Sequence, residues 1–268
     1  MVKVDSKIFY EFEMNMSFLL GYGDDTTKKL IKDLYTTIKA CHEEYMAIIN
    51  ASLRVINRIK KVIEKELDIS RSRIHEILED EFNQYQISQM VTLREDGFRT
   101  LEKEVEIQSI SSIVMLLSLL ESTLFEMISK FTNFNNGEFP EIKSVLKRDK
   151  GIAKYLKYLD GNLSKVEDNF IVGKPIYNEL LHLTNLRNNI VHNSNRYNDD
   201  LYSNSLKLNI QIGHRREYNK FCFNTKSVVQ LGKLVGQILN ICIVEGIFQY
   251  LDVQFLEIDG FFPPIIID

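Results

Sequence analysis

Apolar residues recur along the first third of the chain at alternating steps of four and three residues. The members of this series are Leu34, Ile38, Cys41, Tyr45, Ile48, Ser52, Val55, Ile59 and Val62. The spacing predicts a helix from about Thr27 to Leu67, which Thr26 or Thr27 would cap. Such a helix would be roughly 60 Å long. That length favours a helical hairpin or a coiled coil with a second copy of the chain; the alternative is a long helix packed within its own protomer.

Three further elements are expected before residue 140. A short strand is predicted at 8–12, and a helix from Ser70 to Met90 with Ser70 as its cap. Gly97 marks an expected irregularity. From about residue 101 a stronger pattern predicts a core helix that carries Glu121 on its buried side and ends at 133–140.

The second half of the chain combines helical periodicity with one alternating stretch. A helix is predicted from Ile176 through His192, after an irregular stretch between Gly161 and Pro175. Apolar and polar residues then alternate over 206–212 and again around 221–223, which predicts a small β-hairpin with a basic tip. A buried helix over 227–250 and an apolar tail follow.

Composition narrows the class of protein. The chain has 268 residues, of which 44% are hydrophobic and 26% charged, as in a globular protein with a sizeable core. Its three cysteines are scattered, which favours a reducing compartment. The start of the chain is charged, and no long uncharged apolar run follows, so we expect a cytoplasmic protein without membrane spans. A net charge of −4 disfavours general coating of nucleic acid but allows a local basic site.

Arg187 is the most informative charged residue of the predicted helices. It falls on the same stripe as Leu180, Leu183 and Ile190, where a guanidinium needs a carboxylate partner or an opening for an anion. Glu121, on the apolar face of its own helix, is the natural partner. The alternative is a simple buried ion pair between two core helices.

His192 ends the same helix, just before Asn193. Five residues along a helix turn by about 140°, so Arg187 and His192 cannot share one face of a straight helix. Either the last turn loosens and His192 swings round, or two copies of the helix form a shared pocket. Alternatively, His192 only complements the helix dipole.

The phrase Asn185-Leu-Arg-Asn-Asn-Ile-Val-His-Asn193, together with Leu119-Leu-Glu-Ser122 on the preceding core helix, resembles the HEPN superfamily (higher eukaryote and prokaryote nucleotide-binding domain). Arg187, Asn188 and His192 match its signature over about 108–250. The resemblance implies an all-α helical bundle at 108–250, here with a small β-hairpin. It would follow an N-terminal region with long helices at 1–107 for dimerisation, sensing or regulation, and precede an apolar tail at 251–268.

The resemblance also implies a metal-independent endoribonuclease, acting as a homodimer in toxin, abortive-infection or antiviral defence systems. RNA supplies its own nucleophile, the ribose 2′-hydroxyl, so cleavage needs only proton transfer and positive charge on the phosphate. We assign proton transfer to His192, phosphate stabilisation to Arg187, orientation to Asn188 and support to Glu121. No cofactor or metal is expected, and the products would carry 2′,3′-cyclic phosphate and 5′-hydroxyl ends.

Two basic segments are candidates for binding the RNA substrate: Lys147 with Arg148, and Arg215 with Arg216 at the hairpin tip. The alternative for each segment is that its charges only face solvent and do not bind RNA. The rival function is a non-catalytic dimeric module that binds nucleotides or proteins. An antitoxin or regulatory protein is a further expected partner, because a ribonuclease acting on cellular RNA must be restrained.

Overall fold

The computed structural model describes residues 25–79, 84–134, 151–163 and 171–248. In this part of the chain the protein is mostly helical, with one antiparallel sheet of two strands. The mostly helical class and the small β-hairpin predicted from the sequence are therefore confirmed. The strand predicted at 8–12, the basic pair Lys147 and Arg148, and the tail at 251–268 lie outside the described residues.

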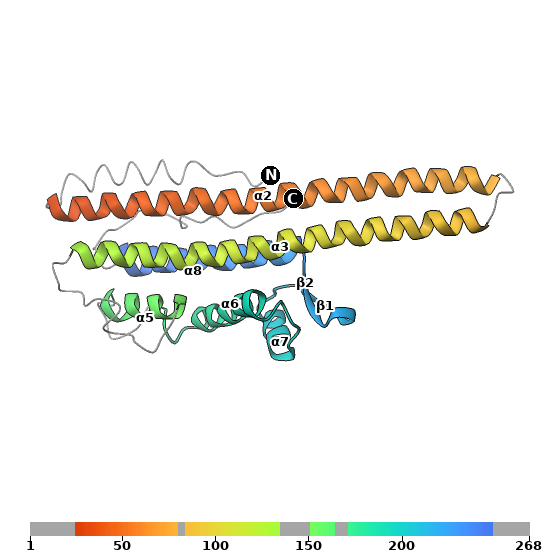
Figure 1. Ribbon diagram of the computed structural model, residues 1–268. Coiled ribbons are helices and arrows are strands. Elements are labelled where there is room, and N and C mark those ends of the chain that lie inside the picture. The colour runs from red at the N-terminus through yellow and green to blue at the C-terminus, as the bar shows by residue number, and fades with distance from the viewer. Residues whose placement is uncertain (1–24, 80–83, 135–150, 164–170, 249–268) are drawn as a thin grey trace.

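Two long antiparallel helices form the spine of the molecule (Figure 1). Helix α2 runs from Asp25 to Glu79 and α3 from Gln84 to Phe134. They pack along each other as a hairpin, one of the arrangements expected from the length of the first helix. At about 1.5 Å per residue, α2 is roughly 83 Å long and α3 roughly 77 Å.

Both helices continue through positions where the sequence pattern predicted an interruption. Ser70 lies inside α2 and Gly97 inside α3, so the helix start predicted at Ser70 and the irregularity predicted at Gly97 are wrong. A serine or glycine inside a helix costs about 1 kcal/mol or less relative to alanine. Interrupting the helix at these positions would cost more, because the backbone hydrogen bonds of one turn would be lost. Packing against the partner helix therefore keeps both helices continuous.

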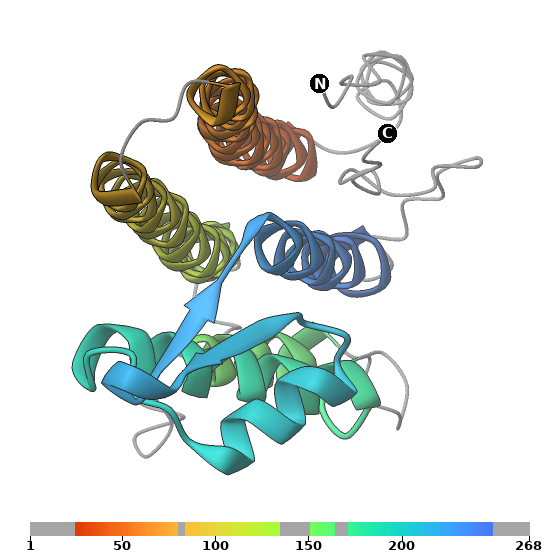
Figure 2. The ribbon, with the colours of Figure 1, turned by 90° about the vertical axis from the view of Figure 1, so that its right-hand side faces the viewer.

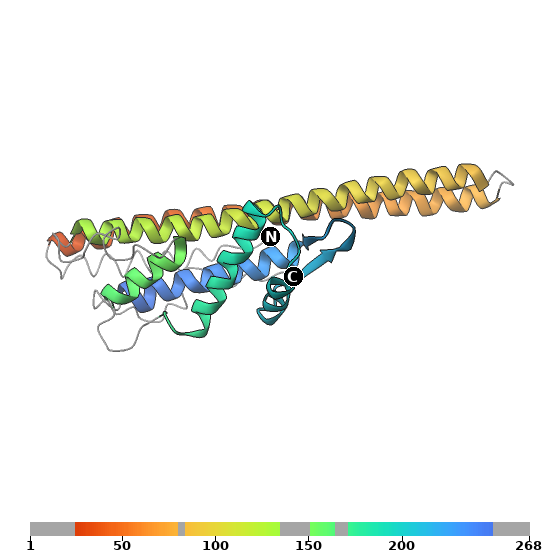
Figure 3. The ribbon, with the colours of Figure 1, turned by 60° about the horizontal axis from the view of Figure 1, so that its bottom comes forward.

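The hairpin is buried over one half of its length and open over the other. On α2, Leu34, Ile38 and Tyr45 are fully buried, whereas Val55 and Val62 of the same apolar series are 40% and 42% exposed. The reason is that the other helices pack only against the first half (Figure 3). We call the second half, residues 54–79 and 84–108, the stalk.

Helix α3 is the centre of the core. Figure 2 shows α8 beside it, with α2 above the two and the layer of α5, α6 and α7 below them. Its fully buried positions include Ile113, Leu120, Leu124 and Met127. A window within 94–133 is apolar enough to cross a membrane by length and composition, but half of it is buried in the fold, as in the core helix of many globular proteins.

Helices α5 (Gly151–Leu163) and α6 (Pro175–His192) pack on α3 and on each other. The predicted α6 is therefore confirmed, and Pro175 occupies its first turn, where a missing N–H group costs nothing. The predicted domain boundary after residue 107 falls inside the unbroken α3.

The segment after α6 departs from the predicted hairpin. Residues 199–207 form helix α7 (Asp199–Lys207), which includes the first two residues of the alternating stretch predicted at 206–212. The side chain of Asn198 caps α7 by accepting a hydrogen bond from Leu201 N at 2.9 Å, and two aspartates occupy its first turn. These local interactions favour a helix over the alternation of apolar residues at 206–212.

The first strand of the hairpin begins at Ile212, where the predicted strand at 206–212 was expected to end. Strand β1 (Ile212–Arg215) pairs with β2 (Lys220–Phe223), and the 3₁₀ turn η1 (Arg216–Tyr218) joins them. Helix α8 (Thr225–Asn240) starts with a capping box and continues into the π-helix η2 (Ile241–Phe248). The closing helix predicted at 227–250 is thus present over its described part. Cys41, Cys222 and Cys242 are free thiols.

Candidate functional site

Helices α3 and α6 bring Glu121 and Arg187 together. Glu121 Oε2 lies 3.9 Å from Arg187 Nη2, so the ion pair predicted from the sequence is present. Neither side chain is buried, since 31% of Glu121 and 29% of Arg187 are exposed. The burial predicted for both residues was therefore wrong. The buried arc of α3 is centred on Leu120, Leu124 and Met127, which leaves Glu121 at its edge.

The guanidinium of Arg187 retains unused hydrogen-bonding capacity. Its Nη1 donates a long hydrogen bond of 3.5 Å to Asn188 Oδ1, and its Nε is buried with no acceptor among the described residues. An arginine carries five N–H donors in a planar fork that matches the oxygens of phosphate. The half-exposed pair with Glu121 orients this fork while leaving it accessible to an anion.

Helix α5 contributes neighbours that the sequence analysis missed. Glu121 Oε1 lies 3.5 Å from the position that a Cβ atom on Gly151 would occupy, and Gly151 has a φ of +61°. One turn later, burial raises the pKa of the Tyr155 hydroxyl, and the negative charge of Glu121 raises it further. The Tyr155 ring also packs on Phe125 at 5.7 Å between centroids. No local sequence signal indicated this contact, because three separate helices form it.

His192 is the last residue of α6, and its side chain is exposed. Because α6 is one continuous α-helix up to this residue, its last turn does not loosen to bring His192 beside Arg187. The two residues are about 140° apart around the axis and separated by roughly 7.5 Å of rise. The continuous helix excludes the loosened last turn; the pocket shared by two copies and a histidine that only complements the helix dipole both stay predictions.

The turn after His192 is held in place by buried asparagines. Asn195 adopts a left-handed conformation with a φ of 60°, and its Nδ2 donates to Phe221 O at 2.8 Å. In return, Phe221 N donates to Asn195 O at 3.1 Å, and Asn195 N donates to Asn189 O at 3.2 Å. The end of α6 is therefore tied to β2.

The two arginines at the hairpin lie in different environments. Arg215 Nη2 forms an ion pair with Glu106 Oε2 of α3 at 3.0 Å, and the two side chains are 26% and 14% exposed. Arg215 thus connects the hairpin to α3. The side chain of Arg216 is exposed, as an RNA-contacting residue would need to be.

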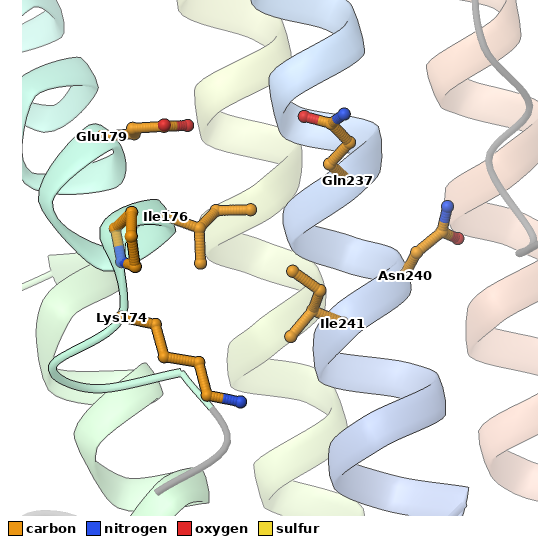
Figure 4. Close-up of a pocket in the computed structure, with 7 residues that line it drawn as sticks. Lys174, Ile176, Glu179, Gln237, Asn240 and Ile241 are labelled. Atoms are coloured by element: carbon orange, nitrogen blue, oxygen red, sulfur yellow. The ribbon is translucent and has the colours of Figure 1, made fainter.

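A separate shallow pocket lies near the start of α6 (Figure 4). It encloses about 500 Å³ and is bordered by Lys174, Ile176 and Glu179 on one side and by Gln237 and Ile241 on the other. Lys174 Nζ lies 3.8 Å from Glu245 Oε2. None of the predicted site residues lines this pocket, because Arg187 and His192 are at the opposite end of α6.

The described residues contain no group of three or more histidine, cysteine or acidic side chains that could hold a metal ion. Comparisons of the chain with family models, curated proteins and solved structures found no match. Any assignment of function therefore rests on the geometry around Arg187 and His192.

Proposed function

We propose that this protein is a metal-independent endoribonuclease of the HEPN type, acting as a toxin or as an effector of abortive infection or antiviral defence. The observation that carries this proposal is the partly exposed cluster that Glu121 of α3 forms with Arg187 and Asn188 of α6, the helix that ends with the exposed His192. The guanidinium side chain is partly exposed, and its buried Nε has no acceptor among the described residues, which a purely structural ion pair does not explain.

In the proposed reaction, His192 takes the proton of the ribose 2′-hydroxyl as the 2′-oxygen attacks the adjacent phosphorus. The new P–O2′ bond forms while the P–O5′ bond breaks, and the 5′-oxygen receives a proton. An imidazole suits either transfer near neutral pH. Arg187 stabilises the charge on the phosphate oxygens, Asn188 orients the guanidinium, and Glu121 holds it at the surface.

The active unit in this proposal is a homodimer. Within one copy, His192 and Arg187 project from different faces of α6. Two copies whose α6 helices meet at their C-terminal ends would place the imidazole of each near the guanidinium of the other. Both groups are open to solvent, so such an approach requires no rearrangement of the core.

We further propose that the protein acts in the cytoplasm under the control of an antitoxin or other regulatory protein. The open part of the stalk supports this regulatory role. It exposes Val55, Val62 and Ile69 at intervals of seven residues, and each is 37–42% exposed. The stalk is not needed to build the cluster around Arg187, so its length calls for another role.

A second candidate is a non-catalytic dimeric module that binds nucleotides or proteins. The distance of 3.9 Å between Glu121 and Arg187 is the observation that favours it, because ion pairs of this kind also join helices in proteins without catalytic activity. The exposed guanidinium could then bind a nucleotide phosphate without cleaving it.

Cleavage of total RNA in the presence of a chelator separates the two candidates. We expect the purified wild-type protein to release fragments with 2′,3′-cyclic phosphate and 5′-hydroxyl ends, and His192→Ala and Arg187→Gln to release none. Arg58→Gln is the matched control, because Arg58 is an exposed arginine of the stalk. Equal cleavage by His192→Ala would contradict the proposal.

Expression in cells completes the test, because a restrained or highly selective nuclease can spare bulk RNA. The wild-type protein should arrest growth and leave RNA breaks with the same ends, whereas His192→Ala should do neither. Absence of both breaks and arrest, together with retained nucleotide binding that Arg187→Gln abolishes, would favour the non-catalytic candidate.

A further inference from the structure

A polar cleft of about 660 Å³ lies between the β-hairpin and the stalk. One wall is the stalk part of α3, and the other is the end of β1 with the turn η1. Figure 3 shows the hairpin beside α3 at the point where α3 leaves the bundle. The ion pair between Arg215 and Glu106 joins the two walls at 3.0 Å and so fixes the width of the cleft.

Three cations of this cleft are available to a ligand. Arg99 and Lys103 come from α3 and Arg216 from η1, and all three side chains are exposed. Unlike Arg215, none of them has an ion-pair partner among the described residues. The cleft therefore presents positive groups on both walls, at positions that a phosphate backbone passing between them would meet.

Aromatic rings accompany these cations. Tyr218 is 59% exposed at the tip of the hairpin. Behind it, the His214 ring stacks on the Tyr197 ring with centroids 3.5 Å apart and an interplanar angle of 12°. His214 Nε2 is also hydrogen-bonded to Asn219 Oδ1 at 3.2 Å. The His214 ring is thus held in a fixed orientation, and the Tyr218 ring is exposed on the adjoining turn, so an unpaired base can stack on either.

A short connection links the end of α6 to the hairpin that forms one wall of the cleft. Tyr197 follows His192 by five residues, which span at most about 18 Å when fully extended. Tyr197 N also donates to Asn219 O at 2.9 Å, so the chain runs directly from His192 to the hairpin that forms the cleft. A nucleic-acid strand bound in the cleft can reach His192 with a few nucleotides.

We propose that this cleft binds single-stranded RNA on one side of the bond to be cut, an inference that rests on the function proposed above. Cations combined with stacking platforms are the recognition mode of single strands, since the bases of a duplex are already stacked and paired. The carboxylates of Asp96, Glu102 and Glu217 also line the cleft and balance its charge. They disfavour polyanions in general, so binding depends on stacking as well as on phosphate contacts.

The experiment measures binding of a fluorescently labelled 12-nucleotide single-stranded RNA and of the matching duplex. All proteins carry His192→Ala to prevent cleavage. Tyr218→Ala should weaken single-strand binding at least fivefold, because stacking of one base contributes about 1 kcal/mol or more, whereas Tyr218→Phe should bind as the parent does. Arg99→Gln with Arg216→Gln should lower the slope of log K against log salt by about 0.7 per cation.

Lys61→Gln is the matched control, because Lys61 is an exposed cation of the stalk outside the cleft. Thermal melting of each variant checks folding. Unchanged binding by the cleft variants, equal or tighter binding of the duplex, or no RNA binding by the parent would each overturn the proposal. Wild-type cleavage that His192→Ala abolishes would still support the proposed nuclease in all three cases, so the two proposals can fail separately.

Discussion

Replacement of Glu121 by glutamine tests whether this carboxylate positions Arg187 for catalysis or only joins two helices. Glutamine keeps the size of the side chain, so the main change is the loss of the negative charge. The lost attraction acts over 3.9 Å between groups that are 31% and 29% exposed.

The effect on stability should be small. Unit charges at that distance attract by about 1 kcal/mol in water, and measured values for solvent-accessible pairs are about 0.2–1 kcal/mol. For a chain of this size, a loss of 1 kcal/mol lowers Tm by about 2–4 °C. The Tm of the Glu121→Gln variant should therefore lie within about 4 °C of the wild-type Tm.

The effect on cleavage should be much larger. A displacement of about 1 Å in a catalytic group can reduce the rate by about 100-fold, and Arg187 would lose the acceptor that orients its fork. We expect kcat/KM for RNA cleavage to fall by about tenfold or more. The assays are thermal melting followed by circular dichroism and cleavage of a labelled RNA under single-turnover conditions.

Glu126→Gln on the same helix is the matched control. Glu126 lies 3.3 Å from Lys130 in an exposed ion pair and accepts a hydrogen bond from Thr37, away from α6. This variant should cleave RNA as the wild type does. A Glu121→Gln variant with wild-type kcat/KM would refute the positioning role. A loss of activity accompanied by a fall in Tm far beyond 4 °C would instead indicate a structural role.

Three further predictions concern the fold. Ile38→Ala removes a fully buried side chain at the α2–α3 contact and should destabilise the protein by about 2–5 kcal/mol in urea unfolding, whereas Val55→Ala, at a position 40% exposed, should cost far less. Arg215→Gln breaks the ion pair with Glu106, which is only 14% exposed, and should increase amide hydrogen exchange in the hairpin while leaving exchange in α2 unchanged; equal exchange in both forms would contradict the connecting role. Burial lowers the pKa of His42 to about 4 from an ordinary 6.5, so the unfolded state binds its proton more readily than the folded state. The stability associated with His42 is complete above about pH 6.5 and is lost as the pH falls towards 4, by up to about 3 kcal/mol. Urea midpoints measured from pH 7 to 4.5 should fall less steeply in His42→Gln, and an unchanged slope would contradict this account.

The pH prediction has a parallel in a second buried histidine. Burial also lowers the pKa of His182, whose Nε2 is hydrogen-bonded to Ser205 Oγ at 2.9 Å. Its contribution has the same sign as that of His42. A His182 variant therefore serves as an internal comparison for the pH series.

The sequence by itself determined the order and kind of most helices. The apolar series from Leu34 to Ser52 identified the buried face of α2, and the stripe of Leu180 and Leu183 identified that of α6. It also indicated that Glu121 pairs with Arg187, because a charge on an apolar stripe needs a partner. These features could be predicted because helical periodicity and the cost of an unpaired charge are local properties of the chain.

Only the tertiary structure decided how far each residue is buried and which helices meet. Val55 belongs to the same series as Leu34 but is exposed, because α8 does not cover the stalk. The Tyr155 ring packs on Phe125 only because α5 packs against α3, and Arg215 contacts Glu106 only because the hairpin folds back onto α3. These contacts join residues far apart in the sequence, and their formation depends on the sum of many packing interactions that no local pattern records.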